Sequence, residues 1–218
     1  MALSPDLTAD RNRALALTPV SRETLDRLDR FVAELLSWRQ RMNLIGASTA
    51  PILWTRHVAD SLQLLALAPQ AKTWADLGSG AGFPGLVLAC ALADTPGVTV
   101  HLVESNGKKA AFLREAAKAT AAPAIIHAVR IVDFVNNQTD GVEVVTARAL
   151  APLSELLSAT YPLLKKGAVG LFPKGQDVEA ELTAATKCWN IQSSLEASLT
   201  DPKARIVKIT GIDRKPQS

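Results

Sequence analysis

One glycine-rich stretch carries the residue types best suited to chemistry: Asp76-Leu-Gly-Ser-Gly-Ala-Gly-Phe-Pro-Gly85. Gly78, Gly80 and Gly82 lack the Cβ atoms that would keep a ligand away from the backbone, and they permit positive φ angles. Apolar residues precede the stretch, and Pro84 is well suited to the first turn of a helix. The free N–H groups of a helix start attract polar or anionic ligands. The stretch therefore predicts a strand, a turn and a helix that bind a nucleotide-like cofactor.

Two registers of this stretch imply different cofactors. Gly80 to Gly85 match the dinucleotide pattern G-x-G-x-x-G, whereas Asp76 to Gly82 match the D-x-G-x-G-x-G turn of S-adenosylmethionine methyltransferases. The first register would place Asp76 and Gly78 inside the strand, where both are unfavourable. The second places Asp76 at the carboxyl end of the strand, where ligands bind in open α/β sheets. A methyltransferase is therefore favoured over a dehydrogenase, and a loop without a ligand is the remaining alternative.

An acid lies at the end of the next predicted strand, residues 98–103. This acid, Glu104, occupies the position that accepts hydrogen bonds from ribose hydroxyls in nucleotide-binding sheets. S-adenosylmethionine carries the same ribose as the dinucleotides, so Glu104 alone does not separate the two cofactors. The alternative is a surface carboxylate in a turn, but the glycine stretch upstream favours the ribose role.

The residues after the predicted strand 124–129 are expected at the adenine edge of the cofactor. Backbone amides of Ile131 and Val132 would face the ring there. Asp133 either accepts a hydrogen bond from the exocyclic amine or caps a short helix, and both possibilities remain open.

Cations follow the later strands. Arg148 ends the predicted strand 142–147 and Lys174 follows the predicted strand 168–172, so both face the ligand edge of the sheet. With Arg56 and His57 from the N-terminal region they would form a basic mouth around the cofactor, suited to a phosphodiester backbone. A single histidine on a helix, such as His57, is more often a structural hydrogen-bonding group than a ligand contact. The predicted strand end at Arg148 has neither an Asn/Asp-Pro-Pro-Tyr/Phe box nor a nucleophilic cysteine, which disfavours amine methylation and a covalent mechanism.

The chain as a whole has the profile of a globular protein. It has 218 residues, 48% of them hydrophobic and 21% charged, which suffices for one α/β unit with an extra element. No apolar run approaches the roughly 18 residues of a transmembrane helix, and no secretory signal precedes the core. Cys90 and Cys188 lack metal-type spacing, so we expect no metal, reduced thiols and a cytoplasmic protein. A net charge of +3 permits a polyanionic partner.

The order of the expected elements defines the fold. Residues 1–17 read as a loose tail, Thr18-Pro19 as the start of an amphipathic helix that ends near Asn43, and residues 51–66 as a second helix. From Lys72 onward strands and helices alternate, and residues 191–199 and 205–211 form a closing hairpin. We therefore expect a doubly wound, Rossmann-like α/β fold of the class I S-adenosylmethionine-dependent methyltransferase type. A tail and helical extension, residues 1–66, would precede the methyltransferase domain, residues 67–218, in one compact unit.

With these residues in place, the chain resembles a known family, the bacterial 16S rRNA (guanine-N7)-methyltransferases, also called RsmG or glucose-inhibited division protein B. The likeness extends from about Leu25 to Lys208. The glycine stretch alone is typical of a whole class, whereas its Phe-Pro-Gly extension together with Arg-His-x2-Asp-Ser is much more specific. The segments that carry the resemblance are Trp38-x4-Asn43-Leu44, Arg56-His57-x2-Asp60-Ser61, Asp76 to Gly85, Glu104-Ser-x-Gly-Lys-Lys109 with Phe112-Leu-Arg114, Arg148-Ala149 and Lys174-Gly175.

The resemblance implies both cofactor and substrate. The cofactor would be S-adenosylmethionine, and the basic mouth would receive a 16S rRNA loop near the decoding region, with methyl transfer to N7 of the guanine at position 527. The partners would be 16S rRNA and the 30S subunit, with no membrane, no metal and a monomeric protein. The implied cofactor contacts are Gly78, Phe83, the backbone of Ile131 and Val132, Arg148, and Glu104 on the ribose.

Two departures from the family pattern are visible. The family often carries an acid where this chain has Val132, so a contact there would come from the backbone. Many members also end in a longer basic stretch, of which this chain keeps Arg214 and Lys215.

Guanine N7 carries an in-plane lone pair and no proton, so its methylation needs no general base. Catalysis would then consist mostly of positioning, with Arg148 and Lys174 as the substrate-positioning residues. Two other functions stay open, a small-molecule methyltransferase of the same fold and a non-catalytic RNA-binding protein that retains it.

Overall fold

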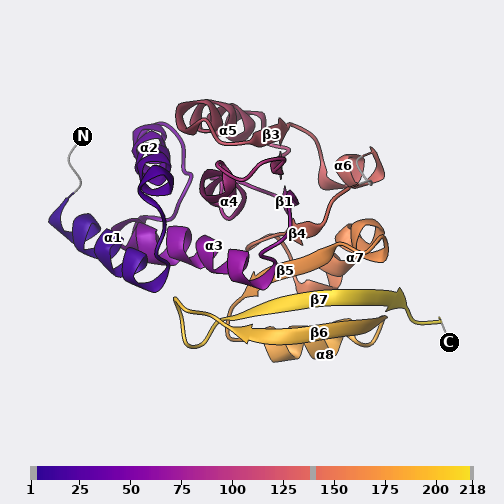
Figure 1. The fold of residues 1–218 in the computed structure, drawn as a ribbon. Coiled ribbons are helices and arrows are strands. Elements are labelled where there is room, and N and C mark those ends of the chain that lie inside the picture. Colours follow the sequence, from indigo (N-terminus) through magenta and orange to yellow (C-terminus); the bar gives the residue numbers. More distant parts are fainter. Residues whose placement is uncertain (1–3, 138–140, 217–218) are drawn as a thin grey trace.

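The computed structural model describes residues 4–137 and 141–216, and its centre is one seven-stranded sheet (Figure 1). The strands lie in the order β3-β2-β1-β4-β5-β7-β6. The first five run parallel, and β7 is antiparallel to both β5 and β6. This is the expected doubly wound sheet with its closing hairpin. The strands are β1 (Thr73–Leu77), β2 (Thr99–Val103), β3 (Ala124–His127), β4 (Val144–Thr146), β5 (Val169–Lys174), β6 (Trp189–Ala197) and β7 (Arg205–Arg214).

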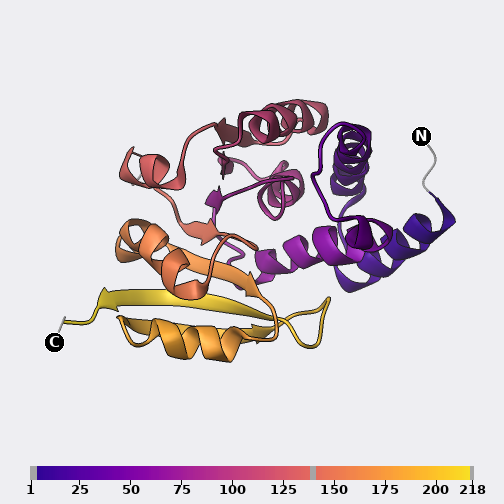
Figure 2. The same ribbon diagram turned by 180° about the vertical axis from the view of Figure 1, so that it is seen from behind.

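Helices cover both faces of the sheet. On one face, α4 (Gly85–Leu92) and α5 (Gly107–Thr120) pack together with the N-terminal helices. On the other face lie α6 (Ile131–Asn137), α7 (Leu153–Lys165) and α8 (Val178–Ala185) (Figures 1 and 2). The alternation of strand side chains divides the core accordingly, since Trp74 of β1 packs on the first face and Ala75 and Leu77 on the second.

The N-terminal extension begins earlier than the sequence suggested. Residues 1–17 were expected to be a loose tail, but α1 (Pro5–Leu17) occupies most of this range, with Ser4 as its N-cap. The pair Ser4-Pro5 is itself a helix-start signal, a cap followed by proline at the first position. The start predicted at Thr18-Pro19 is wrong, because Thr18 closes α1 and the Ser21 hydroxyl caps α2 (Arg22–Arg39).

After α2 the chain forms a run of short, irregular helical turns instead of the single helix expected over residues 51–66. These are η1 (Ala47–Ile52), η2 (Trp54–Ala59), α3 (Asp60–Leu62) and η3 (Gln63–Leu67), with π-type turns in η2 and 3-10 turns in η1 and η3. Apolar side chains of α2 share one buried cluster with α4, α5 and the sheet. The extension and the sheet therefore have a common core. Across the described residues, no helix is long and apolar enough to cross a membrane.

A buried carboxylate fastens α1 to η2. Oδ2 of Asp10 accepts hydrogen bonds from the backbone N–H groups of Trp54 and Thr55 at 2.8 and 3.1 Å, and Oδ1 accepts from the Thr55 hydroxyl at 2.5 Å. Asp10 is only 3% exposed. It satisfies the free N–H groups at the start of η2 from a distant part of the chain.

We predict that Asp10→Ala lowers the free energy of unfolding by about 2–3 kcal/mol, because it leaves buried donors without an acceptor. Urea unfolding followed by circular dichroism measures the change. The exposed Asp6 on the same helix provides the control, and Asp6→Ala should change stability by less than about 0.5 kcal/mol. Equal effects of the two variants would contradict the anchoring role of Asp10.

Candidate active site

The glycine loop after β1 uses its three glycines for different purposes. Gly78, Gly80 and Gly82 have φ angles of 71°, 53° and 87°, so all three adopt the left-handed conformation that glycine tolerates best. A Cβ on Gly80 would meet only the Gly78 carbonyl oxygen, at 3.7 Å. On Gly82 it would lie 3.1 Å from the Phe31 ring of α2. Space at Gly80 is therefore open, whereas Gly82 makes room for the packing of Phe31 and is not among the residues that line the cavity beside the loop.

Asp76 turns into the protein rather than toward a ligand, contrary to its expected role as a cofactor contact. Its carboxylate accepts hydrogen bonds from the Gly85 N–H at 3.1 Å and the Thr146 hydroxyl at 2.8 Å. It thereby holds the start of α4 and the end of β4 against β1. Complete burial raises the pKa of Asp76 to about 6, and these hydrogen bonds offset only part of that effect.

Beside the loop lies a cavity of about 280 Å³, here called the cofactor cavity. Glu104 lies in its wall, where its carboxylate accepts hydrogen bonds from the N–H groups of Gly80 at 3.0 Å and Asn106 at 2.7 Å. Leu150 covers one end, because a Cβ on Gly78 would lie 2.8 Å from its Cδ1 atom. The residues that line the cofactor cavity are Gly78, Gly80, Val103, Glu104, Ser105, Lys109, Ile131, Arg148, Ala149 and Leu150.

The predicted adenine edge is only partly present in this wall. Ile131 lines the cofactor cavity, but Val132 lies outside its lining and is 53% exposed. Asp133 neither lines the cavity nor caps a helix. It lies inside α6 and accepts hydrogen bonds from Arg130 at 3.0 and 3.2 Å. Of the three residues expected at the adenine, Ile131 is the one that the structure brings to the cavity.

Arg148 lies at the end of β4, between the glycine loop and the N-terminal extension. Its guanidinium donates hydrogen bonds to His57 Nδ1 at 2.8 Å and to the Arg56 carbonyl oxygen at 3.2 Å, and Asp60 Oδ2 lies 3.5 Å away. It also lies over the Phe83 ring, 5.4 Å from the centroid. Burial lowers the pKa of Arg148, and the Asp60 carboxylate opposes that shift. Arg148 is therefore a fixed, half-buried cation rather than a mobile one on the surface.

His57 is one of the groups that hold Arg148 in place, and it is not part of an exposed RNA-binding surface, which corrects its expected role. The ring is 9% exposed and stacks on Phe83 with centroids 4.9 Å apart. Because arginine cannot accept a hydrogen bond, Nδ1 is the acceptor, and Nε2 carries the proton that it donates to Thr49 at 3.1 Å. Burial, with Arg148 and Arg56 nearby, lowers the pKa of His57 to about 3.

Phe83 was expected to contact the cofactor, but it is only 5% exposed. It lines neither the cofactor cavity nor a second cavity on the other side of Arg148. Its ring packs against Phe31 of α2, with centroids 5.2 Å apart. The Phe-Pro-Gly extension of the loop thus connects the glycine turn to the N-terminal helices.

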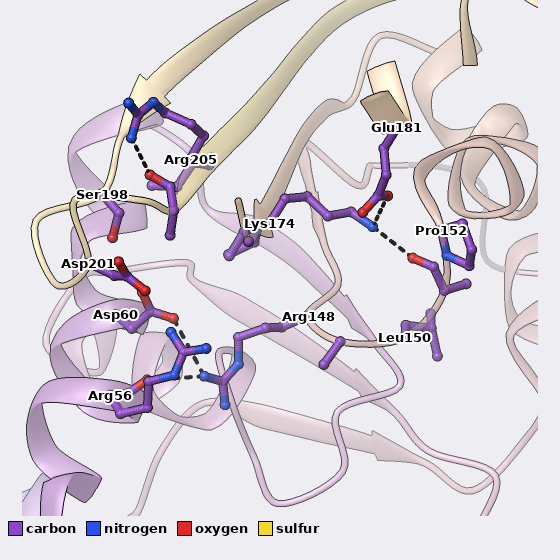
Figure 3. Close-up of a pocket in the computed structure, with 16 residues that line it drawn as sticks. Arg56, Asp60, Arg148, Leu150, Pro152, Lys174, Glu181, Ser198, Asp201 and Arg205 are labelled. Carbon is purple, nitrogen blue, oxygen red and sulfur yellow. Dashed lines mark hydrogen bonds and ion pairs between the residues drawn. The ribbon is translucent and has the colours of Figure 1, made fainter. Parts of the chain in front are cut away.

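A second cavity, of about 520 Å³ and here called the substrate cavity, lies on the other side of Arg148 (Figure 3). The segment Arg148–Leu150 lines both cavities. The substrate cavity is also lined by Arg56, Asp60, Ala151, Pro152, Pro173, Lys174, Gly175, Glu181, Ser198, Asp201, Ala204, Arg205 and Ile206.

Lys174, expected in the basic mouth, lines the substrate cavity, but its charge is already paired. Its Nζ donates to Glu181 Oε2 and to the Ala151 carbonyl oxygen, at 2.8 and 2.7 Å (Figure 3). Arg56 lies exposed at the same cavity. The expected basic mouth is therefore largely neutralised, and Arg56 is its most accessible member.

Four lining residues were not recognised as candidates from the sequence. Asp60 belongs to the Arg-His-x2-Asp-Ser segment, and an acid among apolar helix residues is a signal for a buried partner. Glu181, Asp201 and Arg205 occupy α8 and the β6–β7 hairpin, and no local pattern marks them. Their part in the site follows from tertiary packing alone.

The strand order, the glycine loop after β1 and the acid after β2 together define a class I S-adenosylmethionine-dependent methyltransferase fold. Solved structures agree at low sequence identity. Cofactor-bound Rv0187 from MTB superposes with a TM-score of 0.61 at 15% identity, covering 96% of this chain and 98% of the other. A putative O-methyltransferase from Klebsiella pneumoniae gives 0.59 at 10%, covering 94% and 96%.

Within that class the family is also shown. The chain belongs to the GidB family, rRNA small subunit methyltransferase G, whose family model matches residues 24–209. A relative from Nitrobacter winogradskyi is 59% identical over 97% of this chain and 76% of its own length. One from Bradyrhizobium sp. (strain BTAi1) is 60% identical over 95% and 94%. Both relatives are called ribosomal RNA small subunit methyltransferase G.

The raised pKa of Asp76 predicts a specific pH dependence of stability. The folded carboxyl group binds its proton more tightly than the unfolded one, whose pKa is near 3.8, so its contribution is present below pH 4 and lost as pH rises through about 6. Relative to Asp76→Asn, the unfolding free energy of the wild type should fall by roughly 3 kcal/mol between pH 4 and 7. Denaturant unfolding of both proteins across this range measures the difference, and a constant difference would contradict the raised pKa.

The geometry also predicts that His57 stays neutral throughout physiological pH. The chain has three histidines, so the His57 ring signals can be assigned by comparison with His57→Phe in proton NMR spectra. Between pH 5 and 8 the His57 signals of the wild type should not titrate. In Arg148→Ala the loss of the neighbouring cation should raise the pKa of His57 toward 6.5. A wild-type titration midpoint above 5 would refute the buried acceptor role of Nδ1.

Proposed function

We propose that the protein transfers a methyl group from S-adenosylmethionine to N7 of a guanine in 16S rRNA, at position 527 in the family. The observation that carries the proposal is the pair of cavities that meet at Arg148–Leu150, one beside the glycine loop and one lined by Arg56, Lys174 and the hairpin loop. The relatives at 59% and 60% identity, named for ribosomal RNA methylation, support this substrate.

The residues of the cofactor cavity fit S-adenosylmethionine. Glu104 offers carboxylate oxygens to the ribose hydroxyls, and the backbone at Ile131 would meet the adenine. The backbone of Gly78 and Gly80 would hold the methionine part, because Gly80 has no side chain to exclude it. The chemistry supplied on binding is a methyl group on a positively charged sulfur.

On the substrate side the chain has mainly to position a base. Guanine N7 has an in-plane lone pair, so its attack on the methyl group requires no proton removal. Arg148 is anchored at the junction of the two cavities, where a fixed guanidinium keeps the base and the cofactor in line. Lys174 fixes the opposite wall through Glu181 and Ala151, and the exposed Arg56 is available to an RNA phosphate.

We further propose that the protein acts in the cytoplasm as a monomer, on 16S rRNA within the 30S subunit. Methyl transfer to isolated 30S particles tests the central proposal. Particles from a strain that lacks the enzyme should gain one labelled methyl group, and mapping should place it on N7 of the target guanine. Label on a free metabolite alone would support a small-molecule methyltransferase, and binding of rRNA without transfer would support a non-catalytic RNA-binding protein.

We predict that Arg148→Ala lowers methylation of 30S particles by about 100-fold, because the junction loses its fixed cation. Lys174→Ala should lower it by about tenfold, because the substrate-cavity wall loses its ion pair with Glu181. Binding of S-adenosylmethionine, measured by calorimetry, should change by less than about threefold in either variant. Equal losses of methylation and cofactor binding would contradict the positioning role of the substituted residue.

Arg148→Lys provides the matched control for charge. Lysine keeps the cation but lacks the planar fork that reaches His57 and the Arg56 carbonyl together. If geometry rather than charge is what matters, Arg148→Lys should recover less than a tenth of the lost rate. Recovery of full activity would contradict the geometric role.

A further inference from the structure

The loop Ser198–Ala204, which joins β6 to β7, forms one wall of the substrate cavity. It is fastened to the N-terminal extension at two points. The Thr200 hydroxyl donates to Asp60 Oδ1 at 2.8 Å, and the Leu199 N–H donates to Gln63 Oε1 at 2.8 Å. Because Asp60 also lies beside Arg148, the loop and Arg148 share one buried anchor. The loop is therefore held in place before any ligand arrives.

Two cations and two carboxylates of the substrate cavity compensate one another. Arg148 lies beside Asp60, and Lys174 is paired with Glu181. Asp201, the remaining carboxylate of the lining, forms no ion pair with any residue in the described part of the chain, and neither do the lining cations Arg56 and Arg205. Its Oδ1 accepts from the Lys203 N–H at 2.9 Å, whereas its Oδ2 accepts no hydrogen bond from the described residues. The loop thus presents an uncompensated carboxylate oxygen at this wall.

Guanine and adenine differ on the edge that a carboxylate can read. Guanine offers two adjacent donors, N1–H and the 2-amino group, whereas adenine has an acceptor at N1 and no 2-amino group. A carboxylate accepts from both guanine donors and is repelled by the adenine N1 lone pair. Enzymes that act on an unstacked base commonly read this Watson–Crick edge in the pocket.

The position of the reacting atom, N7, determines where the Watson–Crick edge of the base must point. N7 lies on the opposite side of the purine from the 2-amino group, and N7 has to face Arg148–Leu150, where the cavities meet. In Figure 3, Ser198 and Asp201 lie on one side of Arg148 and Leu150 on the other. The Watson–Crick edge of a base in this orientation is therefore turned toward the hairpin loop.

We propose that Asp201 is the residue that selects guanine, by accepting hydrogen bonds from N1–H and the 2-amino group of the target base. The inference rests on the proposed function. It adds a specificity-determining residue on the C-terminal hairpin, which Asp60 and Thr200 hold in register with Arg148.

The test compares Asp201→Asn with the wild type on 30S particles reconstituted with 16S rRNA that carries guanosine or inosine at the target position. Inosine keeps N7 and N1–H but lacks the 2-amino group. The wild type should prefer guanosine by about tenfold in kcat/KM. In Asp201→Asn the amide NH2 opposes the 2-amino group, so activity on guanosine should fall 10- to 100-fold and the preference should vanish or reverse.

The ratio of the two substrates is the decisive readout, because it does not depend on how much of a variant is folded. Glu196→Gln removes one negative charge from the same hairpin outside the cavity lining, and it should leave the ratio unchanged. Calorimetric binding of S-adenosylmethionine should be the same for all three proteins. An Asp201→Asn variant that keeps the wild-type preference for guanosine overturns the inference, even if its overall rate is low. A wild type that methylates neither particle overturns the proposed function as well.

Discussion

The half-buried guanidinium of Arg148, held by several hydrogen bonds, is the constraint on which the rest of the site depends. It projects from the end of a central strand, yet its hydrogen-bond partners His57, the Arg56 carbonyl oxygen and Asp60 all belong to the N-terminal extension. A cation this deeply placed has to be compensated by nearby acceptors. The extension is therefore part of the catalytic unit, since without it the arginine would lack its partners.

The same segment also links the glycine loop to α2. Phe83 lies between His57 and Phe31, and Gly82 leaves room for the Phe31 ring. The N-terminal extension thus packs against Gly82 and Phe83 of the loop, whereas Gly78 and Gly80 line the cofactor cavity. Neighbouring residues of one motif therefore have different roles, because some of them pack against the extension and others line the cofactor cavity.

The fold could be predicted from local patterns, because strands and helices alternate regularly and the strand predicted at residues 98–103, for example, corresponds to β2, Thr99–Val103. For the site, the positions of several residues could be predicted from the sequence, but their interaction partners could not. Arg148, Glu104 and Lys174 do lie at the ligand edge of the sheet, since strand ends determine that placement. Their partners could not be predicted, because Glu181 and Asp60 reach Lys174 and Arg148 through tertiary packing of distant segments. The inward turn of Asp76 was missed for the same reason, as Thr146 comes from a neighbouring strand.

The pairing of Lys174 with Glu181 changes how ionic strength should act on this protein. Because Arg148 and Lys174 already have internal counter-charges, a nucleotide that enters the cavity beside them displaces few condensed ions from these two cations. Under the proposed function, salt is therefore expected to weaken RNA capture by exposed arginines such as Arg56 more than the placement of the base in the cavity. Long-range attraction then governs the initial capture of RNA, and short-range complementarity governs the fit of the base in the cavity.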